Sequence, residues 1–200
     1  MALNFANNNS LSAITTQPSG LSGSAMTLLS TQTASSSSTI DFTSGIDSTY
    51  DEYVFKFINI HPSSNPAIIS FQATTEGTNF NTTITSTYFR AFHNESGSSS
   101  ALQYASGFDQ AQGTGFQNLD SGSGNYNDKG SCGTLQIFNP SSTTFVKHFL
   151  SQVVNINDGD FTHNVFTAGY FNTTSAITGI RFQMDSGNID SGVIKLYGIS

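Results

Sequence analysis

The stretch STIDFTSGIDSTYDEYVFKFINIHP, residues 38–62, decides the fold class, because it holds the densest run of strand-forming residues in the chain. Successive side chains of a strand point to opposite faces. Aromatic residues at positions 53, 55 and 57 therefore share one face of an extended backbone, and aliphatic residues at 54, 58 and 60 share the other. Because both faces are largely apolar, we predict a central strand that protein covers on both sides.

Turn residues separate similar apolar runs along most of the chain. Asn157-Asp158-Gly159-Asp160 is typical of a tight hairpin. The two Pro-Ser-Ser segments, 62–64 and 140–142, are each expected to form a hairpin loop, because proline ends strand pairing. About nine or ten strands are predicted, with no helix between them. They are placed at about residues 27–33, 38–42, 53–60, 67–73, 82–92, 134–138, 144–156, 161–171, 177–184 and 193–197.

This pattern predicts an all-β fold, an antiparallel two-sheet sandwich of a jelly-roll-like kind. Residues 1–25 have scattered apolar side chains without a period, so we expect an extended N-terminal arm. Residues 26–200 are expected to form a single β-sandwich domain with a long loop at about 95–133. Within that loop we expect a short strand or a helical turn near residues 102–111.

The chain of 200 residues carries few charges and little that could bind nucleic acid. Charged residues make up 10% of it, against about 25% in an average soluble domain. The net charge is −7, with only 6 Lys and Arg residues, so no basic surface for phosphate groups is expected. The start of the chain lacks the pattern of a secretory signal, and no segment is apolar enough to span a bilayer, so we expect synthesis inside a cell without membrane insertion.

Residue types that usually carry catalysis or bind metals are scattered. The four histidines, at 61, 93, 148 and 163, have no zinc-ligand spacing. Segment 155–160 is rich in oxygen ligands but out of step with a calcium-binding loop, so the hairpin is the preferred interpretation. Asp51 and Glu52 are neighbours that point opposite ways on a strand, so they cannot act together on a glycosidic bond. We expect a non-enzymatic protein, with no catalytic residue, cofactor or metal site.

Four segments together resemble small β-rich virion structural proteins of tailed bacteriophages, particularly those infecting marine bacteria. They are LNFANNNSLSAIT (3–15), LLSTQTASSSSTIDFTSGIDSTYDEYVFKFINIHPSS (28–64), LQIFNPSSTTFVKHFL (135–150) and SGNIDSGVIKLYGIS (186–200). The resemblance extends over nearly the whole chain. It implies a component of a phage particle, in the head or in the tail, and it implies no catalytic residues.

The leading hypothesis is a structural protein of the virion, made in the host cytoplasm, that decorates or cements the capsid or forms part of the tail. It is expected to self-associate as a homo-oligomer, for example a trimer, and to dock on other virion proteins. Low-charge faces rich in Ser, Thr and Asn lose their water at little cost when subunits pack. In the arm, Phe5, Leu11 and Ile14 are the expected partner-binding anchors.

The alternative is a carbohydrate-binding module of a tail fibre or tail tip that recognises a host surface glycan. Sandwich loops rich in Asn, Asp, Gly and Tyr can hydrogen-bond sugar hydroxyls while an aromatic ring covers a sugar face. Tyr104, Phe108 and Tyr126, in the loop at about 95–133, are the candidate glycan-binding residues. The absence of tryptophan counts against this alternative. A glycan-cleaving enzyme is the least favoured hypothesis, because no suitably partnered carboxylates can be identified.

Overall fold

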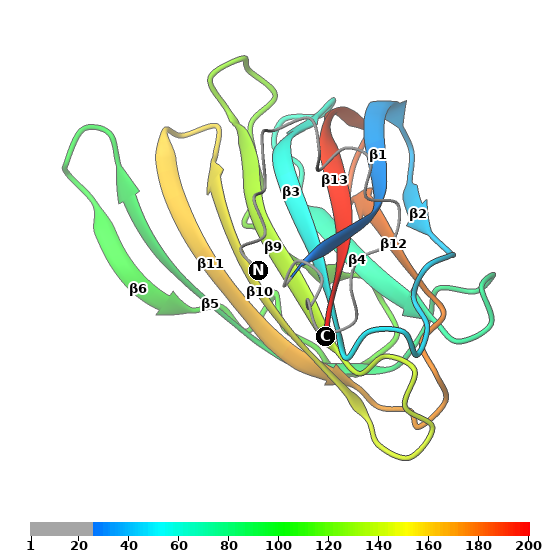
Figure 1. The fold of residues 1–200 in the computed structure, drawn as a ribbon. Coiled ribbons are helices and arrows are strands. Elements are labelled where there is room, and N and C mark those ends of the chain that lie inside the picture. Colours follow the sequence, from blue (N-terminus) through cyan, green and yellow to red (C-terminus); the bar gives the residue numbers. More distant parts are fainter. Residues whose placement is uncertain (1–25) are drawn as a thin grey trace, which may run out of the picture.

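The computed structural model of the chain describes residues 26–200, which form thirteen β-strands and, within that range, no helix (Figure 1). The strands follow one another with only turns and loops between them. They are β1 (Thr27–Ser37), β2 (Ile40–Phe42), β3 (Glu52–Pro62), β4 (Ile69–Thr74), β5 (Ile84–Asn94), β6 (Ser100–Tyr104), β7 (Ala111–Gly113), β8 (Gln117–Asn118), β9 (Gly130–Phe138), β10 (Lys147–Ile156), β11 (Phe161–Phe171), β12 (Gly179–Met184) and β13 (Ile189–Ile199).

The strands form two antiparallel sheets of unequal size. The larger has nine strands in the order β1-β13-β3-β9-β10-β11-β5-β6, with β7 also paired to β5, and the smaller has four in the order β2-β12-β4-β8. The prediction of an all-β antiparallel sandwich is thus confirmed. A jelly roll divides eight strands between its sheets, whereas these sheets have nine and four, so the jelly-roll connectivity stays a prediction.

The core lies between the smaller sheet and strands β3, β9, β10 and β13 of the larger one. Its centre is aromatic. Phe182 of β12 is fully buried and meets the rings of Phe55 and Phe57 edge-on, with centroids 5.2 and 5.3 Å away. Phe71 of β4 packs in the same way on Phe149 of β10, at 5.2 Å. Burial of one such side chain contributes about 1.5–3 kcal/mol, so these contacts between the sheets account for much of the stability.

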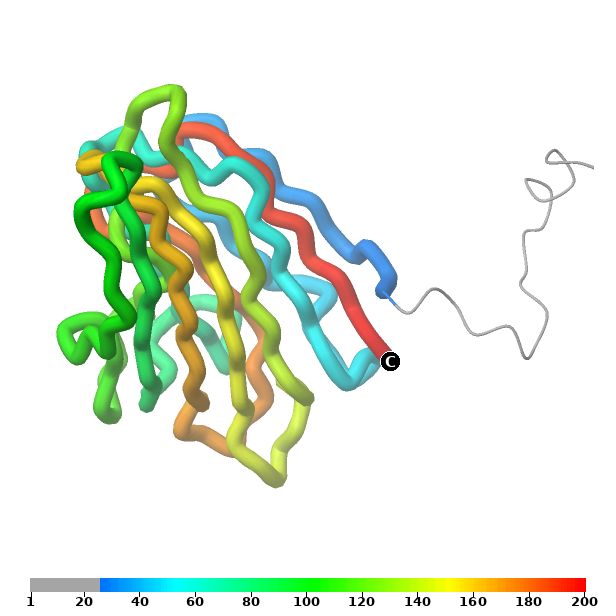
Figure 2. Tube along the Cα trace, turned by 90° about the vertical axis from the view of Figure 1, so that its left-hand side faces the viewer, coloured from blue at the N-terminus to red at the C-terminus, as the bar shows by residue number. Residues whose placement is uncertain are grey.

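The larger sheet extends beyond the smaller one. In Figure 1, β11, β5 and β6 lie to the left of the smaller sheet, which covers the other end of the larger sheet. Figure 2 shows the strands of the larger sheet side by side, with the C-terminus and the start of β1 at one corner. Thr27 pairs with Gly198 there. We call the face of the larger sheet that is turned toward the smaller one the inner face, and the opposite one the outer face.

The prediction of a central strand was right in one respect and wrong in another. β3 does lie inside the larger sheet, between β13 and β9, and its inner side chains Tyr53, Phe55 and Phe57 are buried. Its outer face is covered only in part, because Val54 is buried but Ile58 is 40% exposed. The almost continuously apolar sequence of β3 therefore reflects full burial on the inner face and only partial burial on the outer one.

Two of the three predicted hairpins are confirmed. β9 and β10 pair across the turn at Pro140, and β10 and β11 pair across the turn at Gly159. The segment at Pro62 is not a hairpin, because β3 and β4 belong to different sheets and the chain crosses between the layers there. The long predicted loop contains β6, β7 and β8, so the expected short strand near residues 102–111 is confirmed.

Candidate functional site

Two irregularities in the strand pairing bend the larger sheet near one end of β3. The register shifts at residues 57–60 of β3 and at residues 189–193 of β13, which is typical of β-bulges. Asn59 has a φ of 50° and Gly192 a φ of 122°. A Cβ atom at Gly192 would lie 2.6 Å from the main-chain oxygen of Asn59. Glycine is therefore required at this position, and the bulge turns the Asn59 side chain away from the core.

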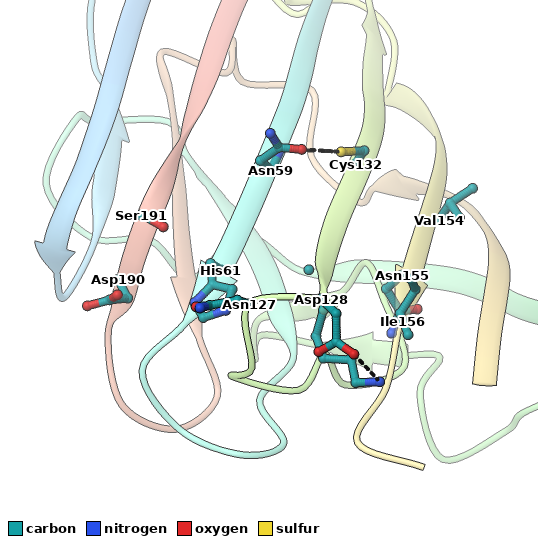
Figure 3. Close-up of a pocket in the computed structure, with 12 residues that line it drawn as sticks. Asn59, His61, Asn127, Asp128, Cys132, Val154, Asn155, Ile156, Asp190 and Ser191 are labelled. Atoms are coloured by element: carbon teal, nitrogen blue, oxygen red, sulfur yellow. Dashed lines mark hydrogen bonds and ion pairs between the residues drawn. The ribbon is translucent and has the colours of Figure 1, made fainter. Parts of the chain in front are cut away.

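The bulges border an open groove of about 680 Å³, shown in Figure 3. Strands β3 and β13 form one wall, β9 and β10 the other, and the loop before β9 closes one end. Most of the lining residues have polar side chains. It consists of Asn59, His61, Asn127, Asp128, Lys129, Gly130, Cys132, Val154, Asn155, Ile156, Asp190 and Ser191.

Local hydrogen bonds hold several of these side chains in place. The main-chain N–H of Asn59 donates to the Cys132 thiol at 3.2 Å, and the thiol lies 3.4 Å from Asn59 Oδ1. His61 Nε2 donates to the carbonyl oxygen of Tyr126 at 3.0 Å. Lys129 is paired with Asp128 and with Asp160, and these carboxylates raise the pKa of the ammonium, with the Asp160 hydrogen bond the largest cause.

The groove is suited to hydrogen bonding. It presents amide, carboxylate, hydroxyl and imidazole groups, which are the groups that bind polar ligands. Cys132 is an exposed free thiol. An imidazole would have to hydrogen-bond the thiol to activate it as a nucleophile, but within residues 26–200 the hydrogen bonds of Cys132 are with Asn59. Within the same range no three His, Cys, Asp or Glu side chains are placed to share a metal ion.

A buried carboxylate in the loop before β9 joins the two sheets. Asp120 is fully buried, and accepts hydrogen bonds from the main-chain N–H groups of Ile69 and Gly122, at 3.3 and 3.1 Å, and from the hydroxyls of Ser123 and Ser131. Burial raises the pKa of Asp120 to about 6, although these hydrogen bonds act in the opposite direction. Asp120 therefore connects β4, the loop before β9 and β9 itself through one side chain.

A second polar cluster adjoins Asp120. The Ser121 hydroxyl is hydrogen-bonded to His163 Nδ1 and to Asn155 Oδ1, which fixes the loop before β9 on strands β10 and β11. Burial, and to a lesser extent the positive charge of Arg90, lowers the pKa of His163 to about 4. The imidazole is therefore neutral at physiological pH, and its hydrogen bond with Ser121 stabilises the packing of the loop.

The outer face carries a group of exposed apolar side chains, which we call the outer patch. Register places Tyr104, Phe89 and Phe166 in one row across β6, β5 and β11. The rings of Phe89 and Phe166 are stacked, with centroids 5.0 Å apart. The same row continues across β10 and β9 to Lys56 on β3 and Lys195 on β13, which lie opposite each other. The exposed members of the outer patch are Ile58, Phe89, Leu102, Tyr104, Leu150 and Val154, which are 40–76% exposed.

The three predicted glycan-binding residues lie in different surroundings. Tyr104 is 55% exposed on β6, and its hydroxyl donates to Asp109. Phe108 is half-buried and stacks on the inner residue Tyr88, with centroids 5.0 Å apart. Tyr126 is exposed next to His61, at the end of β3, so the structure does not bring it together with the other two. The predicted anchors Phe5, Leu11 and Ile14 lie outside the described residues.

Sequence reasoning missed Asp120 and the groove at the bulges. The tripeptide Asp-Ser-Gly at 120–122 recurs at 185–187 and 190–192. Only Asp120 is fully buried, whereas Asp185 and Asp190 are exposed. The tripeptide alone therefore does not indicate which of the three aspartates is buried. The bulge did have a signal in the sequence, because Asn59 is a polar residue that tolerates positive φ within a run of apolar strand residues.

Comparisons with protein-family models, with curated proteins and with solved structures find no match for this chain. Residues 26–200 contain no helix with the length and apolar character needed to cross a membrane.

Proposed function

We propose that this chain is a non-enzymatic structural subunit of a bacteriophage particle, a capsid decoration or tail component that associates with its own copies and docks on other virion proteins. The observation that carries the proposal is the outer patch. In a protein of low charge, a group of large apolar side chains on one sheet face marks a surface that another protein covers. The sequence resemblance to small phage virion proteins gives the proposal its setting.

The outer patch is built for contact with a protein surface. Stacked Phe89 and Phe166 form a rigid aromatic centre, and Leu150 and Val154 project beside them from β10. Only 10% of the residues in the chain are charged, so few charged groups would lose water on assembly. A second copy of the chain has the same faces, which carry few charges and many hydroxyl groups. In a closed symmetric oligomer every subunit makes the same contacts, so their contributions to the free energy of association add up.

Sedimentation velocity over a range of concentrations tests self-association. The wild-type chain is expected to sediment as a closed oligomer. The double variant Phe89→Ser, Leu150→Ser is expected to sediment as a monomer with an unchanged circular dichroism spectrum. Phe145→Ser is the matched control, because Phe145 is 70% exposed in a loop outside the outer patch. A wild-type chain that stays monomeric at every concentration refutes the assembly role.

Docking on the particle is tested separately, through the N-terminal segment. We propose that Phe5, Leu11 and Ile14 attach the subunit to other virion proteins, since their large side chains can fill grooves of a partner. A chain lacking residues 1–25 is expected to fold and to self-associate but to be absent from purified particles. Unchanged occupancy of the truncated chain on particles contradicts this role of the segment, whatever the outcome of the sedimentation experiment.

A further inference from the structure

A second, smaller pocket lies where the larger sheet extends beyond the smaller one. It opens on the inner face, at the ends of β5 and β11 and beside the β10–β11 turn, in the part of the sheet on the left of Figure 1. Its volume is about 330 Å³, at the lower end of the range for ligand pockets, which suits a single sugar ring. The lining residues are Arg90, Phe92, Ser99, Asn157, Phe161 and His163.

Three rings form the wall of this pocket. Phe92 and Phe161 meet edge-on with centroids 5.8 Å apart, and the His163 ring lies 5.6 Å from Phe92 and 6.1 Å from Phe161. Phe92 and Phe161 are half-buried, so each keeps part of its surface accessible. An aromatic surface of this kind packs against the C–H groups on the apolar face of a pyranose ring.

Arg90 supplies a positive charge in this pocket. Its guanidinium lies 5.7 Å from the ring centroids of both Phe92 and Phe108, and two of its N–H groups donate to Gln103 Oε1, at 3.2 and 3.1 Å. A guanidinium has five N–H donors, so three remain. The ion pairs within residues 26–200 involve Lys129 and Arg181 but not Arg90.

An unpaired guanidinium between aromatic rings favours an anionic ligand. Arginine binds a carboxylate through two parallel hydrogen bonds, a geometry that lysine cannot reproduce. Asp160, next to Phe161 in the chain, is already paired with Lys129 and does not neutralise Arg90. Asn157 uses its side-chain oxygen to accept from the N–H groups of Gly159 and Phe161, which leaves its amide N–H₂ for a ligand. The Ser99 hydroxyl is a further polar group at the rim.

We propose that this pocket binds a carboxylate-bearing sugar, a uronic or sialic acid unit of a surface glycan, with the carboxylate on Arg90 and the apolar face of the ring on Phe92 and Phe161. The proposal goes beyond the assembly role and does not depend on it. It places glycan recognition at other residues than Tyr104, Phe108 and Tyr126, although the Phe108 ring lies 5.7 Å from the Arg90 guanidinium.

Isothermal titration of the full chain with free glucuronic acid and N-acetylneuraminic acid tests the proposal. Saturable binding of at least one acid is expected. The methyl ester of that acid is expected to bind at least about tenfold more weakly, because a hydrogen bond between charged groups contributes about 1.5–3 kcal/mol. Equal binding of acid and ester overturns the proposal. Absence of saturable binding of both acids overturns it as well.

Three variants test whether Arg90 itself binds the acid, as opposed to a general effect of charge. Gln103→Glu places a carboxylate on the atom that now accepts from Arg90, with little change in shape, and is expected to abolish binding of the acid. Gln152→Glu adds the same charge on the outer face and is expected to leave binding unchanged. Arg90→Lys is expected to lower affinity about tenfold, since the two-point contact is lost. Equal affinity in the wild type and in Gln103→Glu contradicts the assignment of Arg90.

Discussion

Replacement of Asp120 by asparagine is expected to change how the stability of the protein depends on pH. Asp120 is fully buried and holds four donors, two on the main chain and two on Ser123 and Ser131. Asparagine has nearly the same shape. Its oxygen can accept from the main-chain N–H groups, and its N–H₂ group can donate to the serine hydroxyls, which are able to reverse their role. The variant is therefore expected to fold.

The magnitude follows from the shift of the Asp120 pKa. Burial raises it from 3.8 to about 6, so the folded protein disfavours the ionised carboxylate. The stability that this group contributes is complete below about pH 3.8 and is lost as the pH rises through about 6. Two pKa units at about 1.4 kcal/mol each give a loss of about 3 kcal/mol by pH 7. An asparagine side chain does not titrate, so the variant has no such dependence at this site.

His163 acts in the opposite direction over nearly the same range. Burial lowers its pKa from 6.5 to about 4, so its contribution is complete above about pH 6.5 and is lost as the pH falls through about 4. That loss is also about 3 kcal/mol. In the wild type the contributions of Asp120 and His163 therefore nearly cancel between pH 4 and 6.5. Removal of Asp120 leaves the loss at His163 uncompensated on acidification.

Urea unfolding at several pH values between 4 and 7 measures the effect. The free energy of unfolding of Asp120→Asn, relative to that of the wild type, is expected to rise by about 3 kcal/mol from pH 4 to pH 7. Asp158→Asn, in an exposed turn, is the matched control. Parallel stability curves for the wild type and Asp120→Asn refute the reasoning, because they show that the carboxylate titrates alike in the folded and unfolded chains.

Two further substitutions test the packing of the sheets. Phe182→Ala removes the ring at the centre of the core and is expected to lower the free energy of unfolding by about 3–5 kcal/mol, whereas Phe145→Ala at an exposed site is expected to change it by less than about 0.5 kcal/mol. Gly169→Ala places a Cβ against the main-chain oxygen of Thr85, which cannot rotate away, so a loss of at least about 1–3 kcal/mol is expected. Gly115→Ala has open space around it and is the control. Denaturant midpoints check both expectations, and a fully stable Gly169→Ala contradicts the second.

The parts of the fold that were predictable depend on local patterns. β11 was predicted with its bounds at residues 161 and 171, because an Asp-Gly turn between two strand-forming segments precedes it. β3 was predicted as a central strand, but alternation alone does not show what covers its outer face. The bulge at Asn59 also resets the alternation, since Ile58 points outward and Ile60 is fully buried. Such a shift depends on pairing with β9 and β13.

The buried polar residues were beyond the reach of sequence patterns. Lys147 begins β10 and is fully buried, with its ammonium donating to the carbonyl oxygens of Thr173 and Ser175. A lysine in a strand is usually exposed, and only partners 26 and 28 residues away make this burial possible. Arg90 was predicted to lie on a strand, but its surroundings come from Gln103 on β6 and Phe108 in the following loop. Contacts of this kind arise from topology.

The unequal sizes of the two sheets link the two proposals. In the C-terminal part of β5 both faces are at least partly accessible, and the side chains alternate between them. Phe89 faces outward in the outer patch, whereas Arg90 and Phe92 line the pocket on the inner face. Association through the outer patch therefore leaves the Arg90 pocket open. A subunit built in this way can join its copies with one face of a strand and present a ligand site with the other.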